Sequence, residues 1–487
     1  VAIDNLMTFD GSTLFAIEES PITAGMIWVG TNDGQVQLTK NGGKEWTNLT
    51  ANIPDLPAWG TMANIHPSKY NEGTAYISVD LHQMGDFDPY VYKTDDYGQS
   101  WSKISNGIPK SESSFVHVVK EDPKRAGLLY VGIDKGIYIS HNDGATWDRL
   151  KLNLPPAPVY WMEVQERFDD LVVGTYGRGY YILDDLGAVR NSDKMATKAT
   201  LVDIRDTYRF NSRESIKTDG GSNNSGQNPP NGAIINYFLP EKVTGELSIE
   251  IKDKNGELIR TVRARNNKGV NRAVWNLRYE STFRPKLRVQ PPGRPWVQLN
   301  GEGWRPLVQW DLDLNAGQLG PRVAPGTYEA NLIIKDKAGK VIESISKPLT
   351  VLKDPMAEGT QADLEAQVAF SLELRNAMNL AVVNINAVEV LRKELDDIIA
   401  EVSDRRTQKE AIRLKALAEE VAGKLYDIHL TGAREDAFRS PIKLYGRLSA
   451  LASDINGSGI DFKPTDQQGE VKEVLSDRLE NAIIQFD

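Results

Sequence analysis

Acidic side chains in short loops between predicted strands are the residues of this chain whose type and position could do chemistry. Two carboxylates across a cleft, ~5 or ~6.5–9.5 Å apart, hydrolyse glycosidic bonds by acid–base or nucleophilic catalysis. The sequence alone places no such pair, and the matching Asp positions in successive repeats favour a turn or surface role for each carboxylate. We take Asp33 and Asp134 as candidate ligand contacts. The full set of loop carboxylates is Asp33, Asp80, Asp86, Asp88, Asp134, Asp184 and Asp185.

A glycine-rich segment, Gly174-Thr175-Tyr176-Gly177-Arg178-Gly179, is the most unusual local motif. Its turn could place Tyr176 and Arg178 at the mouth of a central channel, where the guanidinium could bind a carboxylate or a sugar acid in bidentate fashion. Alternatively, Arg178 pairs with Asp184 or Asp185 and closes the last sheet of the repeat. No predicted helix follows the glycines, so the segment is not a nucleotide-binding fingerprint.

The composition excludes several classes of function. The chain has 487 residues, no cysteine and a net charge of −10, so thiol catalysis, disulfides and cysteine metal sites are excluded and nucleic acid is not expected as a partner. The five histidines do not fall at metal-ligand spacing, and no segment approaches the ~18 apolar residues of a membrane span. We expect no metal or cofactor, although Asp95-Asp96 or Asp184-Asp185 could bind Ca²⁺ weakly.

The elements that must position these residues are repeats of about 45 to 55 residues. Each repeat has an apolar strand ending in a small residue, a turn of the form S/T-x-D/N-x-G, and a tryptophan three positions later. The Asx side chain and the glycine form a tight turn, over which the tryptophan packs. We interpret these residues as structural: Asn41, Gly43 and Trp46; Asp96, Gly98 and Trp101; Asn142, Gly144 and Trp147.

This repeat resembles the Asp-box, or bacterial neuraminidase repeat. The fuller segments VGTNDGQVQLTKNGGKEW, YVYKTDDYGQSW and LLYVGIDKGIYISHNDGATW are similar to the propellers of sortilin-like proteins and of large secreted bacterial proteins often called glycosyl-hydrolase-like. The resemblance implies a β-propeller and an extracytoplasmic location. It implies little about activity.

Residues 1–187 contain about four blades. Closed propellers use 4–8 blades, and sortilin-like propellers use more than four. We therefore expect the remaining blades in an N-terminal half of the same propeller, present as a separate fragment and bound as a partner. Residues 188–230 are rich in Gly, Ser and Asn and predict a linker.

The rest of the chain predicts two further domains, which makes the whole a multidomain protein, mainly β and then α. Alternating strands over 231–355 predict an immunoglobulin-like β-sandwich with a long insertion at 281–322, which contains the candidate ligand contacts Trp296 and Trp304. Apolar residues at helical spacing over 356–487 predict an antiparallel helical bundle.

Two functions remain open. The first is an extracytoplasmic binding or scaffold protein that holds a protein, peptide or glycan partner with its propeller and sandwich surfaces. There the insertion either forms the contact surface or folds back on its own sandwich. The alternative is a secreted glycoside hydrolase, similar to sialidases or xyloglucanases, with some catalytic carboxylates in the separate fragment. A cleft with two close carboxylates and exposed aromatic residues would favour the hydrolase.

Overall fold

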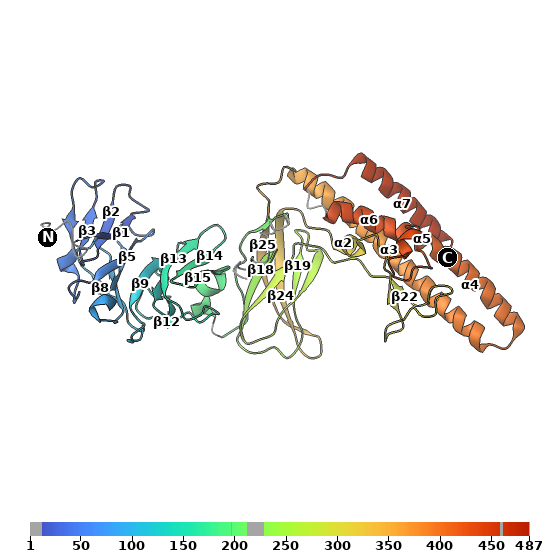
Figure 1. Cartoon of the computed structure of the whole chain (residues 1–487), viewed down its shortest axis with the longest axis horizontal. Helices are drawn as coiled ribbons and strands as arrows, with labels where there is room; N and C mark the ends of the chain where they lie inside the picture. The colour runs from blue at the N-terminus through green and yellow to red at the C-terminus, as the bar shows by residue number, and fades with distance from the viewer. Residues whose placement is uncertain (1–11, 196, 212–227, 458–460, 487) are drawn as a thin grey trace. The chain divides into compact units, whose positions relative to one another are not determined.

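The computed structural model describes residues 12–195, 197–211, 228–457 and 461–486 (Figure 1). It divides into two compact units, Val1–Arg205 and Asp206–Asp487. Within the described ranges, no helix combines the length and the apolar character that crossing a membrane requires.

The first unit is a series of antiparallel sheets in which consecutive strands pair in chain order, as in propeller blades (Figure 1). Blade 1 comprises β1 (Leu14–Glu19), β2 (Ile27–Thr31), β3 (Val36–Thr39) and β4 (Thr47–Asn48); blade 2 comprises β5 (Thr61–Pro67), β6 (Ala75–Asp80), β7 (Tyr90–Thr94) and β8 (Ser102–Lys103); blade 3 comprises β9 (Val116–Glu121), β10 (Leu129–Ile133), β11 (Gly136–Ser140) and β12 (Asp148–Arg149); blade 4 comprises β13 (Val159–Gln165), β14 (Asp170–Thr175) and β15 (Gly179–Leu183). Short 3-10 turns lie at Thr50–Asn52 (η1) and His82–Met84 (η2).

The three predicted turns have the same hydrogen bonds. In blade 2, Asp96 Oδ1 accepts from the Ser100 amide at 2.9 Å, and Thr94 Oγ1 accepts from the Gly98 amide at 2.9 Å. Gly98 has a φ of 81°, a left-handed conformation that favours glycine. The equivalent bonds join Asn41 to Glu45, Thr39 to Gly43, Asn142 to Thr146 and Ser140 to Gly144.

The tryptophans that follow these turns differ in burial. Trp101 and Trp147 are 6% and 4% exposed, because each packs against the preceding blade. Trp46 of blade 1 is 43% exposed. The expectation that each tryptophan is covered therefore holds only where a preceding blade supplies the cover.

Much of the predicted linker is packed. Arg190 is 8% exposed. Its Nε donates to both carboxylate oxygens of Asp122, at 2.8 and 2.9 Å, and its Nη1 donates to Asp169. These two carboxylates belong to blades 3 and 4, so the segment after β15 fastens these blades together. Its elements are α1 (Gly187–Arg190), η3 (Ser192–Lys194), β16 (Thr200–Leu201) and, in the second unit, β17 (Thr207–Arg209).

The second unit begins with two packed sheets. Trp275 is fully buried and meets Tyr328 edge-on, with ring centroids 5.5 Å apart, which joins the sheet of β18 and β21 to the five-stranded sheet. The five strands run in the order β17-β25-β24-β19-β20, and β17 is parallel to β25. The bounds are β18 (Ala233–Leu239), β19 (Leu247–Lys252), β20 (Leu258–Arg263), β21 (Gly269–Trp275), β24 (Gly326–Lys335) and β25 (Val341–Lys353).

Helices form the rest of this unit and pack on α3 (Figure 1). An apolar stripe along α3, with Met378, Val382 and Ile385 all fully buried, lies in the same core as residues of α4, α6 and α7. Thr360 and Asp363 form a capping box that fixes the start of α3. The helices are α3 (Gln361–Glu401), α4 (Arg405–Leu425), α5 (Asp436–Arg439), α6 (Leu444–Gly457) and α7 (Asp466–Ile484).

The insertion packs against these helices, which differs from the expectation that it folds back on its own sandwich. It contains β22 (Lys286–Leu287), β23 (Arg305–Pro306) and α2 (Leu314–Gln318). Leu287, Leu307 and Leu314 belong to the helical core, so the insertion is part of that core rather than a free loop or a cover of its own sandwich.

Candidate functional site

The loops that follow the second strand of each blade lie on one face of the blade series, here called the loop face. Because consecutive strands are antiparallel, this face also carries the start of each innermost strand, β1, β5, β9 and β13. The loop face brings predicted site residues of different blades to one side of the molecule. These are Asp33 in blade 1, Asp80 in blade 2, Asp134 in blade 3, and Tyr176 and Arg178 in blade 4.

His117, at the start of β9, lies between two of these carboxylates. Its Nδ1 is 3.8 Å from Asp80 Oδ2, and its Nε2 is 4.0 Å from Asp134 Oδ1. Both contacts are longer than hydrogen bonds, and Nε2 has no hydrogen-bond partner among the described residues. Because the two carboxylates contact one imidazole, their nearest oxygens are at most about 10 Å apart, a limit that includes the separations used by glycosidases.

Burial controls the charge of this histidine. The side chain of His117 is 4% exposed, and desolvation lowers its pKa below the ordinary value although Asp80 and Asp134 act in the opposite direction. The ring is therefore neutral at pH 7. A neutral imidazole between two carboxylates has one N–H donor and one acceptor to offer, so it orients polar groups without adding charge.

Aromatic rings continue from His117 toward solvent. Tyr160 of β13 stacks on the imidazole with ring centroids 4.0 Å apart, and Tyr176 lies 5.4 Å from Tyr160. Tyr160 is 46% exposed and Tyr176 71% exposed, so each presents ring surface to solvent. Burial and the nearby carboxylates Asp80 and Asp134 raise the pKa of Tyr160, which keeps its hydroxyl protonated.

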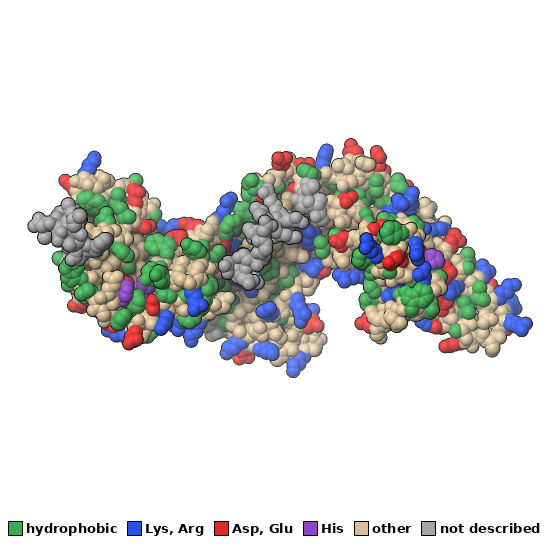
Figure 2. Space-filling model, viewed as in Figure 1, with side chains coloured by type: hydrophobic (Ala, Val, Ile, Leu, Met, Phe, Trp, Pro, Cys, Tyr) green, Lys and Arg blue, Asp and Glu red, His purple; other side chains and the backbone are tan. Residues whose placement is uncertain are grey.

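Asp80 is held in place by the residue two positions later. Its Oδ1 accepts from the backbone amide of His82 at 2.9 Å, and both carboxylate oxygens lie within 2.8 Å of His82 Nδ1. Phe115 stacks on the His82 ring at 4.7 Å and meets His117 edge-on at 5.0 Å. Figure 2 shows histidine side chains at the surface of the blade unit, beside hydrophobic and acidic side chains.

The structure separates the other predicted residues from this cluster. Asp33 accepts hydrogen bonds from Ser12 Oγ at 2.7 Å and from Thr31 within its own blade, which marks it as a turn residue. Arg178 is exposed. Asp184 and Asp185 follow the far end of β15, so the predicted ion pair with Arg178 would have to span the length of that strand.

The remaining acidic candidates have structural partners. Asp86 accepts from the Tyr90 hydroxyl at 2.8 Å, Asp88 pairs with Lys110, and Asp185 Oδ1 accepts from the Gly187 amide at 3.0 Å. Asp95, proposed as a weak Ca²⁺ ligand, pairs with Lys93 at 2.7 Å. Across the described ranges, no group of three or more His, Asp or Glu side chains is arranged to hold a metal ion.

Trp296 and Trp304 lie on the insertion of the second unit. Trp296 is 63% exposed, with Arg294 above its ring at 5.6 Å. Trp304 Nε1 donates to Glu302 at 2.8 Å, and Lys286 lies over its ring at 5.1 Å. The two tryptophans therefore belong to a surface of their own in the second unit.

The base of the insertion is fixed by a buried carboxylate on α3. Glu389, with no exposed surface, accepts from the amides of Arg288 and Val289 at 2.6 and 3.1 Å. Its other oxygen accepts from Arg392 and from the Tyr426 hydroxyl. The pKa of Tyr426 is raised by burial and by this carboxylate.

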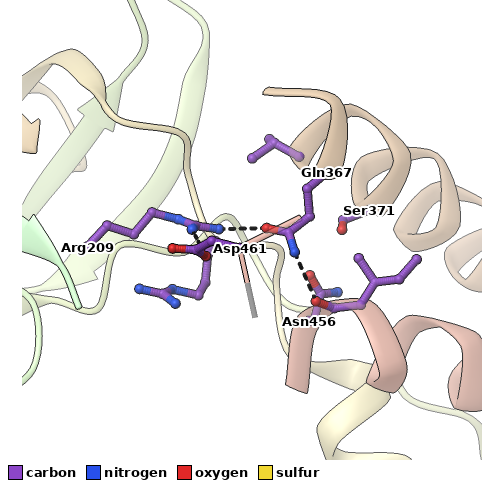
Figure 3. A pocket seen from close by; sticks show the side chains of 8 residues that line it. Arg209, Gln367, Ser371, Asn456 and Asp461 are labelled. Carbon is purple, nitrogen blue, oxygen red and sulfur yellow. Dashed lines mark hydrogen bonds and ion pairs between the residues drawn. The ribbon is translucent and has the colours of Figure 1, made fainter. Parts of the chain in front are cut away.

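A small pocket lies where β17 meets the helices of the second unit (Figure 3). Arg209 donates to Asp461 and, at 2.9 Å, to Gln367 of α3. Burial and the neighbouring Arg209 lower the pKa of Arg322 to about 10. The space left is about 10 Å³, room for one water molecule. We therefore interpret the pocket as a structural junction.

Sequence reasoning did not find His117, Tyr160, His82 or Phe115. His117 and Tyr160 are the second residues of innermost strands, and Phe115 directly precedes one. The only available signal was their position: Phe115, His117 and Tyr160 lie at the start of innermost strands, and His82 lies in the loop after Asp80, which was already a candidate.

Comparisons with known sequences give a partial likeness. No protein-family model matches the chain. Over 114 residues it is 29% identical to the oligoxyloglucan-reducing end-specific xyloglucanase of Emericella nidulans. That alignment covers 22% of this chain and 13% of the enzyme, so the chain spans only a small part of this curated relative.

Among solved structures, the chain is similar to propeller proteins. The GH74 xyloglucanase from Xanthomonas campestris gives a TM-score of 0.30 at 12% identity, over 74% of this chain and 48% of that chain. The GH74 enzyme of Niastella koreensis gives 0.30 at 12% identity, over 70% and 54%. YCF48 bound to D1 peptide gives 0.27 at 18% identity, over 36% and 52%. The propeller character of this chain rests on its own blades rather than on these scores.

Proposed function

We propose that the blades bind a polysaccharide across the loop face and hydrolyse it, as a glycoside hydrolase of the propeller type. The observation that carries this proposal is the pair Asp80 and Asp134 around His117, with exposed rings of Tyr160 and Tyr176 beside it. Sugar rings present C–H faces that pack on aromatic side chains and hydroxyls that bond carboxylates. The exposed rings of Tyr160 and Tyr176 and the carboxylates of Asp80 and Asp134 supply both kinds of contact.

The exposure of the two carboxylates suggests their roles. Asp134, 25% exposed, is the more accessible of the two carboxylates, so we assign it to the glycosidic oxygen as general acid. Asp80 is 12% exposed and fixed by His82, so we assign it to the attacking water as general base. His117 lies between the two carboxylates, beyond hydrogen-bond distance of either, and touches no bond that breaks.

The substrate class is proposed from the curated relative, whose name gives it as a xyloglucanase. A β-linked glucan with side chains is an extended ligand, for which a row of rings in neighbouring blades is a suitable surface. Such polysaccharides occur outside the cytoplasm, and the likeness to sortilin-like and Asp-box proteins points the same way, so we place the protein there.

The test uses xyloglucan oligosaccharides as the probe. Calorimetry measures binding, and a reducing-end assay measures hydrolysis. We expect both with the wild-type chain, and binding without hydrolysis in Asp134→Asn. Absence of both binding and hydrolysis with xyloglucan and other β-glucans would overturn the proposal. Binding with no hydrolysis in the wild type would leave a glycan-binding protein and would refute the catalytic part.

A binding or scaffold role is the second candidate, because of the insertion in the second unit. Its base is fixed to α3 through Glu389, while Trp296 and Trp310 remain 63% and 59% exposed. Tryptophan is favoured at protein interfaces, and a rigid support lowers the entropic cost of binding. If Trp296→Ala removes glycan binding and Tyr176→Ala does not, the glycan-binding surface is the insertion.

A further inference from the structure

The insertion of the second unit forms a cavity of its own. All the residues that line it belong to the insertion, from the segment before β22 to the end of α2, and its volume is about 160 Å³. A cavity of roughly 150 Å³ with apolar walls is large enough for a benzene-sized group. The cavity therefore has room for one small molecule or one side chain, but not for a run of sugar rings.

Most of the cavity wall is apolar. Leu307 and Leu314, 7% and 6% exposed, also belong to the helical core, so the wall that they provide is fixed by the packing behind it. A buried water molecule typically has about three polar partners, which apolar walls do not offer. The wall therefore favours an apolar occupant. Its apolar residues are Pro285, Pro306, Leu307, Val308, Leu312 and Leu314.

Two buried amide side chains also line the cavity, and they differ in their hydrogen bonds. Gln318, 8% exposed, donates from Nε2 to the Tyr445 hydroxyl at 3.0 Å. Gln309 is 5% exposed, and its Nε2 has no hydrogen-bond partner among the described residues. A buried N–H group without an acceptor costs stability. An oxygen atom of a ligand in the cavity would supply the missing acceptor.

Arg284 gives the cavity its charge. It is the only charged side chain in the lining, it is exposed, and no acidic side chain of the described ranges pairs with it. Its charge also reaches the Tyr445 hydroxyl: burial raises the pKa of Tyr445 to about 12, while the hydrogen bond from Gln318 and the charge of Arg284 act in the opposite direction. A guanidinium with no partner of its own is a suitable group to bind a carboxylate.

We propose that this cavity binds a small apolar group that ends in a carboxylate. The carboxylate accepts a hydrogen bond from Gln309 Nε2 and pairs with Arg284, and the apolar group packs on the proline and leucine side chains. A free branched or aromatic carboxylic acid and the C-terminal residue of a peptide both present this chemistry. The site lies in the second unit and does not depend on the polysaccharide site proposed for the blades.

Calorimetry with the whole chain tests the ligand class. Isovalerate is the probe for a free acid, and N-acetyl-Gly-Gly-Leu is the probe for a peptide terminus. We expect at least one of them to bind with a dissociation constant of about 1 mM or tighter. Binding of isovalerate identifies a free acid as the ligand, and binding of the peptide alone identifies a peptide terminus.

The uncharged amides of the two probes are the matched controls. The amide of the probe that binds should bind roughly tenfold more weakly or worse, because it carries no charge for Arg284. An amide that binds as tightly as its acid would overturn the proposal. If neither acid binds at about 10 mM, tenfold above a millimolar dissociation constant, water alone fills the cavity and the proposal is overturned.

A change at Gln309 tests the buried donor. Gln309→Met keeps the length of the side chain and removes the N–H group, so the affinity for the acid should fall by roughly tenfold or more. The melting temperature should not fall, because the lost N–H group had no partner in the protein. Gln318→Met, which breaks the bond to Tyr445, should lower the melting temperature.

A change at Arg284 tests the cation without disturbing the core, because this side chain is exposed. Arg284→Gln should lower the affinity for the acid by roughly tenfold or more. Arg406→Gln, on an exposed arginine of α4 outside the cavity, is the matched control and should leave the affinity unchanged. Unchanged affinity in both Gln309→Met and Arg284→Gln would place the acid elsewhere and refute the proposal.

Discussion

The imidazole of His117 and the phenol of Tyr160 lie face to face, with centroids 4.0 Å apart and planes 21° apart. One ring starts the innermost strand of blade 3 and the other that of blade 4. This stack spans a blade joint, so the contacts that pack two blades also fix the imidazole between Asp80 and Asp134. The proposed binding surface and the packing of two blades therefore share one residue, His117.

Replacing Asp134 by Asn should separate chemistry from binding. The amide keeps the shape of the carboxylate and cannot donate a proton as an acid, so hydrolysis of xyloglucan oligosaccharides should fall by roughly 10²–10⁴-fold. Calorimetry should give an affinity within about threefold of the wild type. Asp88→Asn, on a carboxylate that pairs with Lys110, is the matched control and should retain activity.

Removing the exposed ring of Tyr176 should weaken binding. An aromatic contact contributes about 0.5–1.5 kcal/mol, so Tyr176→Ala should raise the dissociation constant by roughly three- to tenfold, with a smaller effect from Tyr176→Phe. Phe438→Ala removes an equally exposed ring, 82% exposed, from the second unit and should leave the affinity unchanged. Equal losses in both alanine variants would refute the loop face as the binding surface.

Two neutral histidines should make the blade unit sensitive to acid. Desolvation lowers the pKa of His117, and desolvation with the charge of Lys120 lowers the pKa of His66 to about 3. The unfolded chain binds these protons near pH 6.5 and the folded chain resists them, so stability is complete above pH 6.5 and declines as the pH falls toward 3. The slope approaches about 1.4 kcal/mol per pH unit for each histidine.

Hydrogen exchange in β5 and β9 measures this effect where it arises. Protection, corrected for intrinsic exchange, should fall between pH 7.5 and 5.5 in the wild type. His66→Leu removes one titrating group and should reduce the fall. His141→Leu changes a histidine for which we propose no such role and is the control. An unchanged fall in His66→Leu would contradict the assignment.

Glu389 should be essential to the second unit. Replacing it by Gln removes the nearer of the two carboxylates of buried Arg392 and leaves Glu419 at 3.4 Å, so we expect a loss of up to about 3 kcal/mol in the free energy of unfolding. The insertion should also become accessible, with new tryptic cleavage after Arg288, which Val289 follows. Glu394→Gln, on the exposed side of the same helix, should change neither readout.

The repeated turns could be predicted from sequence because their chemistry is local. An Asx oxygen, a hydroxyl and a left-handed glycine lie within five residues of each other, and those residues alone specify the geometry. The alternating strands and the apolar stripe of α3 could be predicted for the same reason. A hydrophobic period of two residues in a strand, or of three to four in a helix, already fixes which face is buried. Once the blades were recognised, the pairing of antiparallel strands was enough to place the loops after the second strands on one face.

Contacts between distant residues were decided only by the tertiary structure. His117 belongs to the candidate site because the fold brings Asp80 and Tyr160 next to it. Asp80 lies 37 positions before His117 and Tyr160 lies 43 positions after it, so no local sequence pattern encodes these contacts. The insertion packs on α3 because Glu389 receives amides about 100 positions earlier. Trp46 and Trp147 share one motif but differ tenfold in exposure, because burial depends on the presence of a neighbouring blade and not on the residue itself.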